Sequence, residues 1–319
     1  MRVAVVDIGT NSTRLLIADV DGDSGTLEVL TRDSRVTRLG EGVDASGSLA
    51  DAAIDRVAQV LSTYREQIEQ HECEVNMAVL TSAVRDAANG ADFAARVRDE
   101  YRLDARVLSG DEEAQLTFLG AMSGHVGTRA GSDADDADAD TPTVVIDIGG
   151  GSTEFVVGRA NTAGFHTSLH VGVVRMSERH IHTDPPEPSE LQDLAADVKD
   201  NFEQGLPQQE RHAVQRAIAV AGTATSAAAI DQELDPYDPE RVNGYTLTLG
   251  TVEMLLARLA DMDETQRRNV VGLHPDRAPT IIAGMIVLSE AMRAFELDQV
   301  EVSEHDILYG GALRLAGVG

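Results

Sequence analysis

The sequence has 319 residues, of which 42% are hydrophobic, and its single cysteine, Cys73, excludes an intrachain disulfide and a cysteine-rich zinc site. Its formal net charge is −28 and its only lysine is Lys199, which leaves no basic face for duplex nucleic acid and favours a protein that stays soluble in a halophilic cytosol. No apolar run approaches the roughly 20 residues of a membrane span and no signal sequence is recognisable, so we expect a cytoplasmic protein with no membrane partner.

The first half of the chain begins with three strands and continues with alternating helices and strands. The strands are predicted at 3–6, 15–20, 27–30, 77–80 and 105–108. The helices are predicted at 49–72, at 91–101 and from 111 onwards. Strands that are separated by helices predict a sheet with a parallel portion and with both of its faces covered.

The segment "GSDADDADADT" at 131–141 lacks apolar periodicity and is typical of a solvated linker or surface loop. The same order of elements then returns. The second set of strands is predicted at 144–146, 155–157, 169–173, 217–220 and 300–302, and the helices at 189–204, 251–260, 278–295 and from 223 and 306 onwards. We therefore predict an α/β protein with two domains that face a cleft, domain I at 1–125 with 305–319 and domain II at 126–304.

One strand and turn motif occurs twice, as "AVVDIGTNSTRLLIA" at 4–18 and as "VVIDIGGGSTEFVVG" at 144–158. A tight glycine-containing turn between two strands gathers several backbone N–H groups, which can converge on an oxyanion. A single turn of this kind often only reverses the chain, but two copies with equivalent residues favour phosphate binding. The hydroxyl groups that can add to the two turns belong to Ser12, Thr13, Ser152 and Thr153.

The acidic residue before each turn, Asp7 or Asp147, can hold a hydrated divalent cation beside a phosphate. The two copies differ at one charged position, where the first has Arg14 and the second has Glu154. A guanidinium suits an oxyanion, whereas Glu154 adds a second carboxylate beside Asp147. We predict that the first turn binds phosphate and that the second binds Mg²⁺ and water, with Asp7 as a further candidate metal ligand.

Two stretches of the first half carry further candidate residues. Arg85, in "LTSAVRDAANG" at 80–90, can pair with a phosphoryl oxygen or bridge carboxylates of its own loop. The stretch "VLSGDEEAQL" at 107–116 ends a strand and opens a helix, so its three acids at 111–113 fall in the first helical turn. Acids at that position also stabilise a helix through its dipole, so the pattern leaves a structural and a catalytic role open.

In the second half, "VAGTATSAAA" at 220–229 combines a strand, a turn at Gly222 and a helix start that can meet an anion. Three arginines, Arg35, Arg38 and Arg175, fall on strands or loops. They either face the substrate or lie on the surface among acids.

Five segments in this order resemble the exopolyphosphatase/guanosine pentaphosphate phosphatase (Ppx/GppA) family, and they are "DIGTNSTRLLI", "TSAVRDAAN", "SGDEEAQLTFLGA", "DIGGGSTEFVVG" and "AGTATSAAA". The stretches "LHVGVVRMSE" and "GLHPDRAPTIIAG" fit the same pattern. The family belongs to the actin, Hsp70 and sugar-kinase superfamily, so the resemblance implies two duplicated ribonuclease H-like domains and a homodimer. Many members carry a C-terminal helical extension similar to an HD-type domain; none is recognisable in this sequence, so long-chain processivity is not implied.

The resemblance also implies a role for each candidate residue. Glu113 is implied as the general base for the attacking water, and Arg85 as the residue that binds the phosphoryl group. Asp147 and Glu154 are implied to organise Mg²⁺ and that water. The implied phosphate cradle consists of Gly9, Thr10, Asn11, Ser12, Arg14, Gly149, Gly150, Gly151, Ser152 and Gly222.

The expected reaction is hydrolysis of the terminal phosphoanhydride bond of inorganic polyphosphate, with Mg²⁺ as cofactor and K⁺ or high salt as a condition. A phosphatase of guanosine pentaphosphate uses the same motifs, so the sequence does not separate these two substrates. A small-molecule kinase of the same fold would need an acceptor site with a catalytic acid, and "SGDEEA" favours water as the acceptor. Intact acids at Glu113, Asp147 and Glu154 disfavour a non-catalytic polyphosphate or nucleotide sensor.

Overall fold

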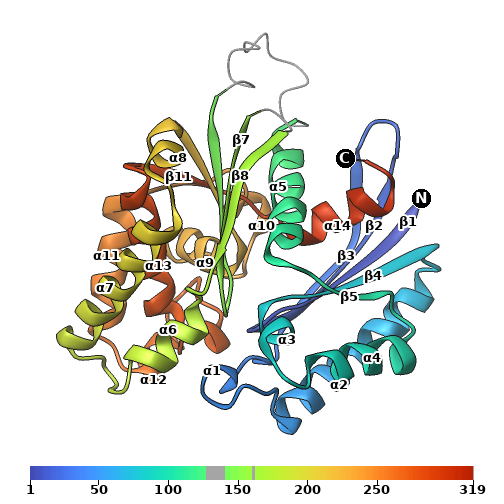
Figure 1. Cartoon of the computed structure of the whole chain (residues 1–319), viewed down its shortest axis with the longest axis horizontal. Helices are drawn as coiled ribbons and strands as arrows, with labels where there is room; N and C mark the ends of the chain where they lie inside the picture. The colour runs from blue at the N-terminus through green and yellow to red at the C-terminus, as the bar shows by residue number, and fades with distance from the viewer. Residues whose placement is uncertain (127–140, 160–161, 319) are drawn as a thin grey trace. The chain divides into compact units, whose positions relative to one another are not determined.

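A computed structural model of the chain describes residues 1–126, 141–159 and 162–318 (Figure 1). The chain divides into two compact units, unit 1 at Met1–Ala130 with His305–Gly319, and unit 2 at Gly131–Glu304. Of the predicted linker at 131–141, only the last residue belongs to the part that the structure describes. No helix within the described ranges is both long and apolar enough to cross a bilayer.

Unit 1 is built on a five-stranded sheet with the strand order β3-β2-β1-β4-β5. Its strands are β1 (Arg2–Ile8), β2 (Ser12–Val20), β3 (Leu27–Val36), β4 (Val75–Leu80) and β5 (Ala105–Val107). Its helices are α1 (Val43–Ser46), α2 (Asp51–Gln70), α3 (Ser82–Asp86), α4 (Gly90–Tyr101), α5 (Gly110–Val126) and α14 (Ile307–Leu315). The first three strands form an antiparallel meander, and β1, β4 and β5 are parallel.

Helices cover both faces of this sheet, as the sequence predicts. Helices α2 and α4 lie on one face of the sheet and α14 on the other (Figure 1). Side chains of β1 alternate between the faces, so that Ala4 and Val6 belong to the core on the side of α2 and α4, whereas Val3 and Val5 belong to the core on the side of α14. The buried face of α2 follows the helical period, with Ala53, Val57, Leu61, Tyr64 and Ile68. Asp7 alternates with Val6, and its side chain therefore points to the face that α14 covers.

Unit 2 repeats this arrangement with additions. Its strands are β6 (Thr143–Ile148), β7 (Thr153–Arg159), β8 (Thr162–Leu169), β9 (Arg216–Val220), β10 (Thr246–Thr248) and β11 (Gln299–Val302), in the order β10-β11-β9-β6-β7-β8. Its helices are α6 (Val173–His180), α7 (Pro188–Gly205), α8 (Gln208–Ala213), α9 (Ala221–Asp231), α10 (Pro239–Val242), α11 (Leu249–Ala260), α12 (Glu264–Arg267), the 3₁₀ helix η1 (Pro275–Arg277) and α13 (Ile281–Ala294). Without the added edge strand β10, the order and the strand directions match those of unit 1, so the predicted duplicated ribonuclease H-like architecture is confirmed.

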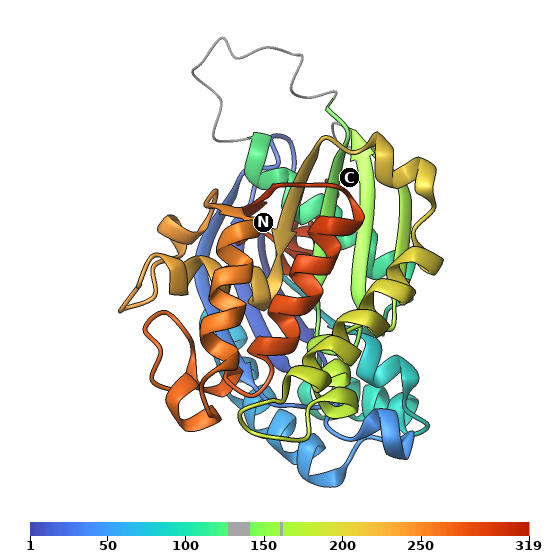
Figure 2. The same ribbon diagram turned by 90° about the vertical axis from the view of Figure 1, so that its left-hand side faces the viewer.

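The core of unit 2 lies between its sheet and a layer of helices. Helix α13 contacts both α7 and α11, and Figure 2 shows it between them. Every residue of α13 from Ile281 to Met292 is buried, because neighbouring helices and the sheet surround it. This mostly apolar helix is therefore the centre of the core.

One predicted strand of unit 2 is placed wrongly. The strand predicted at 169–173 lies earlier, at Thr162–Leu169, and residues from Val173 onwards form α6. The apolar run at 171–174 is buried for a different reason, since the backbone N–H of Val173 bonds to the carbonyl of Gly149 at 3.0 Å. Apolar runs of this length do not distinguish a strand from a segment that packs beneath a turn.

Candidate functional site

The predicted site residues of unit 1 gather at one edge of its sheet. The strand register aligns Ile8 with Leu80 and Leu80 with Val107, so β1, β4 and β5 end together. The first turn, α3 and α5 follow these three strand ends. The carboxyl edge of parallel strands is the usual ligand-binding edge of an α/β sheet. In unit 2 the register aligns Asp147 with Val220, so the second turn and the start of α9 lie at the equivalent edge.

The two turns have the same backbone geometry. In each, the N–H of the first glycine bonds to the carbonyl of the serine three residues later, at 3.0 Å from Gly9 to Ser12 and 2.9 Å from Gly149 to Ser152. A Cβ atom on either glycine would lie 3.1 Å from that carbonyl oxygen. The sequence repeat is therefore also a structural repeat, and glycine is favoured at its first position because the turn closes so tightly.

In unit 1, the segment after β3 occupies the carbonyl groups of the turn. The N–H of Gly40 bonds to the carbonyl of Thr10 at 2.8 Å. The N–H groups of Thr37 and Arg38 bond to the carbonyl of Asn11 at 3.0 and 2.9 Å. These bonds hold the turn from behind.

In unit 2, the segment after β8 does the same. The N–H of Val174 bonds to the carbonyl of Gly150 at 2.8 Å, and Nε of Arg175 bonds to the carbonyl of Gly151 at 3.0 Å. The second turn is thus supported by the same part of the fold, the stretch directly after the third strand of the meander.

With their carbonyls occupied, both turns present unpaired N–H groups. Within the described ranges, the backbone N–H groups of Thr10, Asn11, Gly150 and Gly151 donate to no protein acceptor. Successive N–H groups at a glycine-containing turn form a concave anion-binding site. This arrangement fits the phosphate role predicted for the two turns, which remains a prediction.

The hydroxyl groups of Thr13 and Thr153 do not take part, and this expectation is wrong. Both side chains are fully buried. The hydroxyl of Thr13 is 3.0 Å from that of Thr37, and the hydroxyl of Thr153 donates to the carbonyl of Val171. These threonines tie each turn to the segment that supports it, which leaves Ser12 and Ser152 as the candidate hydroxyl donors.

Arg14 is held by two buried carboxylates of unit 1. Its Nε and Nη2 bond to Oδ2 of Asp7 at 2.9 and 2.6 Å, and its Nη1 bonds to Asp306, the N-cap of α14. Burial raises the pKa of Asp7 despite the lowering effect of Arg14. Burial would also raise the pKa of Asp306, but Arg14 and Arg32 outweigh it and lower that pKa. Arg14 and Asp7 therefore form an ion pair with each other. The predicted binding of phosphate by Arg14 and of metal by Asp7 stays a prediction.

We expect Asp306→Asn to destabilise the protein by about 3 kcal/mol at neutral pH, because the asparagine keeps an acceptor for the N–H of Leu308 but loses the charge that faces the largely buried guanidinium of Arg14. The lowered pKa of Asp306 means that its stabilisation is present above the ordinary aspartate pKa and is lost as pH falls towards the folded value. Urea unfolding from pH 7 to 3 at fixed salt would test this. Asp19→Asn, which breaks an exposed pair with Arg2, should show a much smaller loss.

At the equivalent positions of unit 2, two carboxylates, Asp147 and Glu154, take the place of Asp7 and Arg14. Glu154 lies directly opposite Asp147 in the strand register, and the two side chains are 1% and 7% exposed. The hydroxyl of Ser168 donates to Oε1 of Glu154 at 2.7 Å. Two buried carboxylates at facing positions are a pair that a divalent cation can bind between them.

This donor set fits Mg²⁺. Magnesium sites in phosphoryl-transfer enzymes commonly use one or two carboxylates and complete the shell with water and phosphate oxygens. No group of three or more potential metal-ligating side chains occurs in the described part of the chain, so water and substrate would supply the remaining ligands.

Arg85 and Glu113, predicted from separate stretches, are brought together in unit 1. Nη1 of Arg85, on α3, lies 3.0 Å from Oε2 of Glu113, on α5, and also bonds to the carbonyl of Leu108 at 2.9 Å. The Glu113 side chain is 9% exposed. The pair places a cation and a largely buried carboxylate side by side at the edge where β4 and β5 end.

The neighbouring acid has a structural role. The carboxylate of Glu112 accepts the backbone N–H and the hydroxyl of Ser109, and the N–H of Glu112 donates to the hydroxyl of Ser109 at 3.2 Å. This reciprocal pattern is a capping box at the start of α5. The structural role that the sequence leaves open therefore belongs to Glu112, whereas Glu113 lies in the buried ion pair and its catalytic role stays a prediction.

The structure adds Arg277 as a candidate site residue that the sequence did not single out. Gly222 lies at the start of α9, directly after Ala221, whose φ of 64° is left-handed. A Cβ atom on Gly222 would lie 1.3 Å from Nη1 of Arg277, so the guanidinium lies directly against the glycine. The signal was the stretch "GLHPDRAPTIIAG", which contains Arg277 and fits the family pattern without indicating a contact with Gly222.

The three other arginines separate into different environments. Arg35 is exposed and pairs with Asp33 at 3.2 Å, as expected of a surface residue. Arg38 adjoins the first turn through its backbone N–H, and Arg175 contacts the second turn through its side chain.

Comparison with known proteins places this geometry in a family. The Ppx/GppA phosphatase family matches residues 16–314. Exopolyphosphatase 2 of Mycobacterium tuberculosis is 38% identical over 327 residues, which cover 99% of each protein. The Ppx/GppA family member of Aquifex aeolicus has a crystal structure with a TM-score of 0.80, 28% identity, and coverage of 99% of this chain and 97% of that one. An exopolyphosphatase from Cytophaga hutchinsonii has a TM-score of 0.84, 25% identity, and coverage of 100% and 99%.

The family match spans most of the chain, and the similarity to exopolyphosphatase 2 covers nearly all of it. The turns, the acids and Arg85 that the sequence singled out all lie at the strand ends of one duplicated fold. The chain therefore belongs to the Ppx/GppA phosphatase family and is a phosphoanhydride hydrolase.

Proposed function

We propose that this protein is an Mg²⁺-dependent exopolyphosphatase, which hydrolyses the terminal phosphoanhydride bond of inorganic polyphosphate and releases orthophosphate. The observation that carries the proposal is the pair of Arg85 and Glu113 at 3.0 Å, a cation for a phosphoryl oxygen beside a carboxylate for water. The 38% identity to exopolyphosphatase 2 across 99% of both proteins supports polyphosphate as the substrate.

Unit 1 would supply the general base and part of the phosphate cradle. Glu113 would accept a proton from water as its oxygen attacks the terminal phosphorus, a contribution typically of about 10²- to 10⁴-fold. Arg85 would bind a phosphoryl oxygen and would move from Glu113 towards the substrate as it does so. The unpaired N–H groups of Thr10 and Asn11 would bind further oxygens.

Unit 2 would hold the cation and further phosphate oxygens. Asp147 and Glu154 are the residues that would hold Mg²⁺, which would neutralise charge on the phosphates and orient water when bound. The N–H groups of Gly150 and Gly151 and the guanidinium of Arg277 would bind phosphate oxygens. These groups need only to position the reactants and neutralise charge, because the leaving phosphate is already stable.

A substrate panel tests this proposal directly. Orthophosphate release would be measured in molar KCl with Mg²⁺ from long-chain polyphosphate, guanosine pentaphosphate and ATP, the last with and without acetate or a sugar. We expect the highest kcat/KM on polyphosphate, with chains that shorten from their ends. A higher kcat/KM on guanosine pentaphosphate would show that this nucleotide, and not polyphosphate, is the preferred substrate. Transfer of phosphate from ATP to acetate or a sugar would show that the protein is a kinase. Tight binding without turnover would indicate a sensor.

A further inference from the structure

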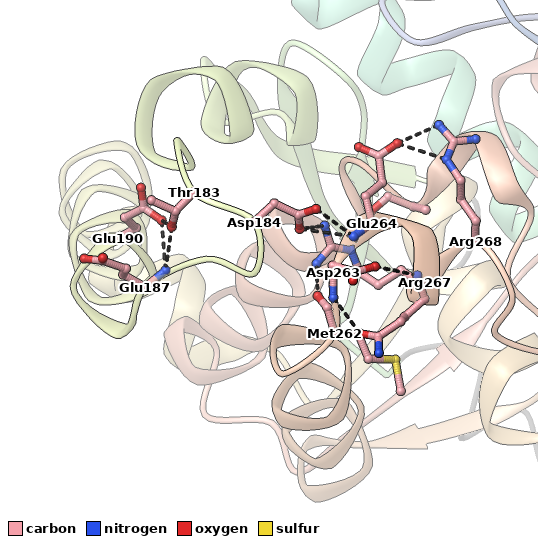
Figure 3. Close-up of polar contacts among 11 residues, drawn as sticks. Thr183, Asp184, Glu187, Glu190, Met262, Asp263, Glu264, Arg267 and Arg268 are labelled. Carbon is pink, nitrogen blue, oxygen red and sulfur yellow. Dashed lines mark hydrogen bonds and ion pairs between the residues drawn. The ribbon is translucent and has the colours of Figure 1, made fainter.

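A buried arginine of unit 2 holds the segment that precedes Arg277. Arg267, at the end of α12, is 4% exposed, and all three nitrogens of its guanidinium group make hydrogen bonds. Figure 3 shows the partners Met262 and Asp184. Its Nη1 bonds to the carbonyl of Met262 at 2.5 Å, its Nε to the carbonyl of Ala278 at 3.2 Å and its Nη2 to Oδ1 of Asp184 at 2.9 Å. One guanidinium therefore closes the loop that runs from 262 to 278.

The partner of this arginine comes from a distant part of the chain. Asp184 lies in the loop between α6 and α7, and its two carboxylate oxygens also accept the N–H of Glu264 at 3.1 and 2.8 Å (Figure 3). Asp184 thus binds both the first and the last residue of α12. Among the described residues, its carboxylate is the ion-pair partner of the buried Arg267 guanidinium.

The carbonyl of Ala278 that Arg267 binds is adjacent in the chain to Arg277, the residue that lies against Gly222. Ala278, whose carbonyl accepts from Arg267, directly follows Arg277. Nη1 of Arg277 lies against Gly222, at a distance that leaves no room for a Cβ atom. A chain of contacts therefore leads from Asp184 through Arg267 and the backbone of Ala278 to the guanidinium at the start of α9.

We propose that Asp184 and Arg267 are positioning residues that hold Arg277 over the start of α9, where its guanidinium binds the polyphosphate substrate. This inference rests on the proposed function. A long, flexible arginine contributes most to binding when its backbone is already fixed, because less conformational freedom is lost on binding. The two residues act on substrate affinity through Arg277 and make no contact with substrate themselves.

A double-mutant cycle between Asp184→Asn and Arg277→Gln tests this, with KM and kcat measured on polyphosphate. We expect Arg277→Gln to raise KM about tenfold or more, the loss of one hydrogen bond to a charged group. Asp184→Asn should raise KM by about three- to tenfold with a much smaller change in kcat, and Asp184→Glu should recover part of this. In the Arg277→Gln background, Asp184→Asn should change KM no further.

The matched control is Asp197→Asn, which changes a carboxylate of the same unit that pairs with Arg179 at 3.1 Å and with His180 at 2.8 Å. Among the described residues, the polar partners of this carboxylate do not include the 262–278 loop. This variant should leave KM unchanged. If Asp184→Asn does not fold, Arg267→Lys replaces it in the cycle, since lysine keeps the charge but cannot make the three bonds. Additive effects, or an unchanged KM in Asp184→Asn, would overturn the inference.

A binding measurement separates this inference from the proposed function. The Kd of inorganic tripolyphosphate would be measured by calorimetry for the same variants in a Glu113→Gln background, which removes turnover. Absence of polyphosphate hydrolysis by the unmodified protein would overturn the proposed function alone. The double-mutant cycle, measured as the Kd of tripolyphosphate, would then still decide whether Asp184 acts through Arg277. We expect Asp184→Asn to change this Kd no further in the Arg277→Gln background.

Discussion

Glu113→Gln should lower kcat for polyphosphate hydrolysis by about 10²- to 10⁴-fold while KM stays within a few-fold of its original value. Glutamine has nearly the same shape and can still contact Arg85, but it cannot accept a proton from water. Steady-state release of orthophosphate at saturating Mg²⁺ would measure the change. Binding of tripolyphosphate by calorimetry would show that the site remains intact.

The neighbouring residue provides a matched control for this variant. Glu112→Gln makes the same substitution one position earlier, where the carboxylate caps α5 through Ser109. It should leave kcat almost unchanged and cost at most about 1 kcal/mol of stability, because a glutamine still makes a capping box. Equal losses of turnover in the two variants would show that the start of α5 matters only as a structure and would remove Glu113 from the chemistry.

Asp147→Asn should lower kcat by about 10²-fold or more and raise the Mg²⁺ concentration needed for half-maximal activity. The substitution removes one of two charges that would hold the cation, and a bound metal contributes several kcal/mol of charge stabilisation. Mg²⁺ titrations of the rate, with ionic strength held constant by KCl, would measure both effects. Ser168→Ala removes a hydrogen bond to Glu154 and should shift the Mg²⁺ requirement about 10- to 100-fold.

The equivalent position in unit 1 decides whether the effect is specific. Asp7→Asn changes the residue that corresponds to Asp147, but Arg14 already neutralises Asp7. If only the second turn holds the metal, Asp7→Asn should leave the Mg²⁺ dependence unchanged. An equal shift in Asp7→Asn would establish Asp7 as a ligand. No shift in Asp147→Asn would contradict the proposed metal site.

The difference between the two turns shows which properties of a repeated motif can be predicted from its sequence and which cannot. The exchange of Arg14 for Glu154 is visible without a structure, and it predicts that the first copy binds phosphate and the second binds Mg²⁺ and water. The sequence does not reveal that Arg14 also bonds to Asp306, 292 positions later. That contact exists because the chain returns to unit 1 and the N-terminus of α14 packs on the same face of the sheet as Asp7.

The sequence by itself determined the elements of the duplicated fold and the residue types of the site, because hydrophobic periods and glycine-containing turns are local and appear in both halves. The family resemblance singles out Glu113 among the acids of "DEE", but only the tertiary structure shows that this acid is buried beside Arg85, since adjacent helical residues differ in the direction they face. The tertiary structure also decided that Arg277 reaches Gly222, and that the turn carbonyls are occupied from behind while their N–H groups stay unpaired within the described residues. Those contacts join segments far apart in the chain, and packing rather than local preference sets them.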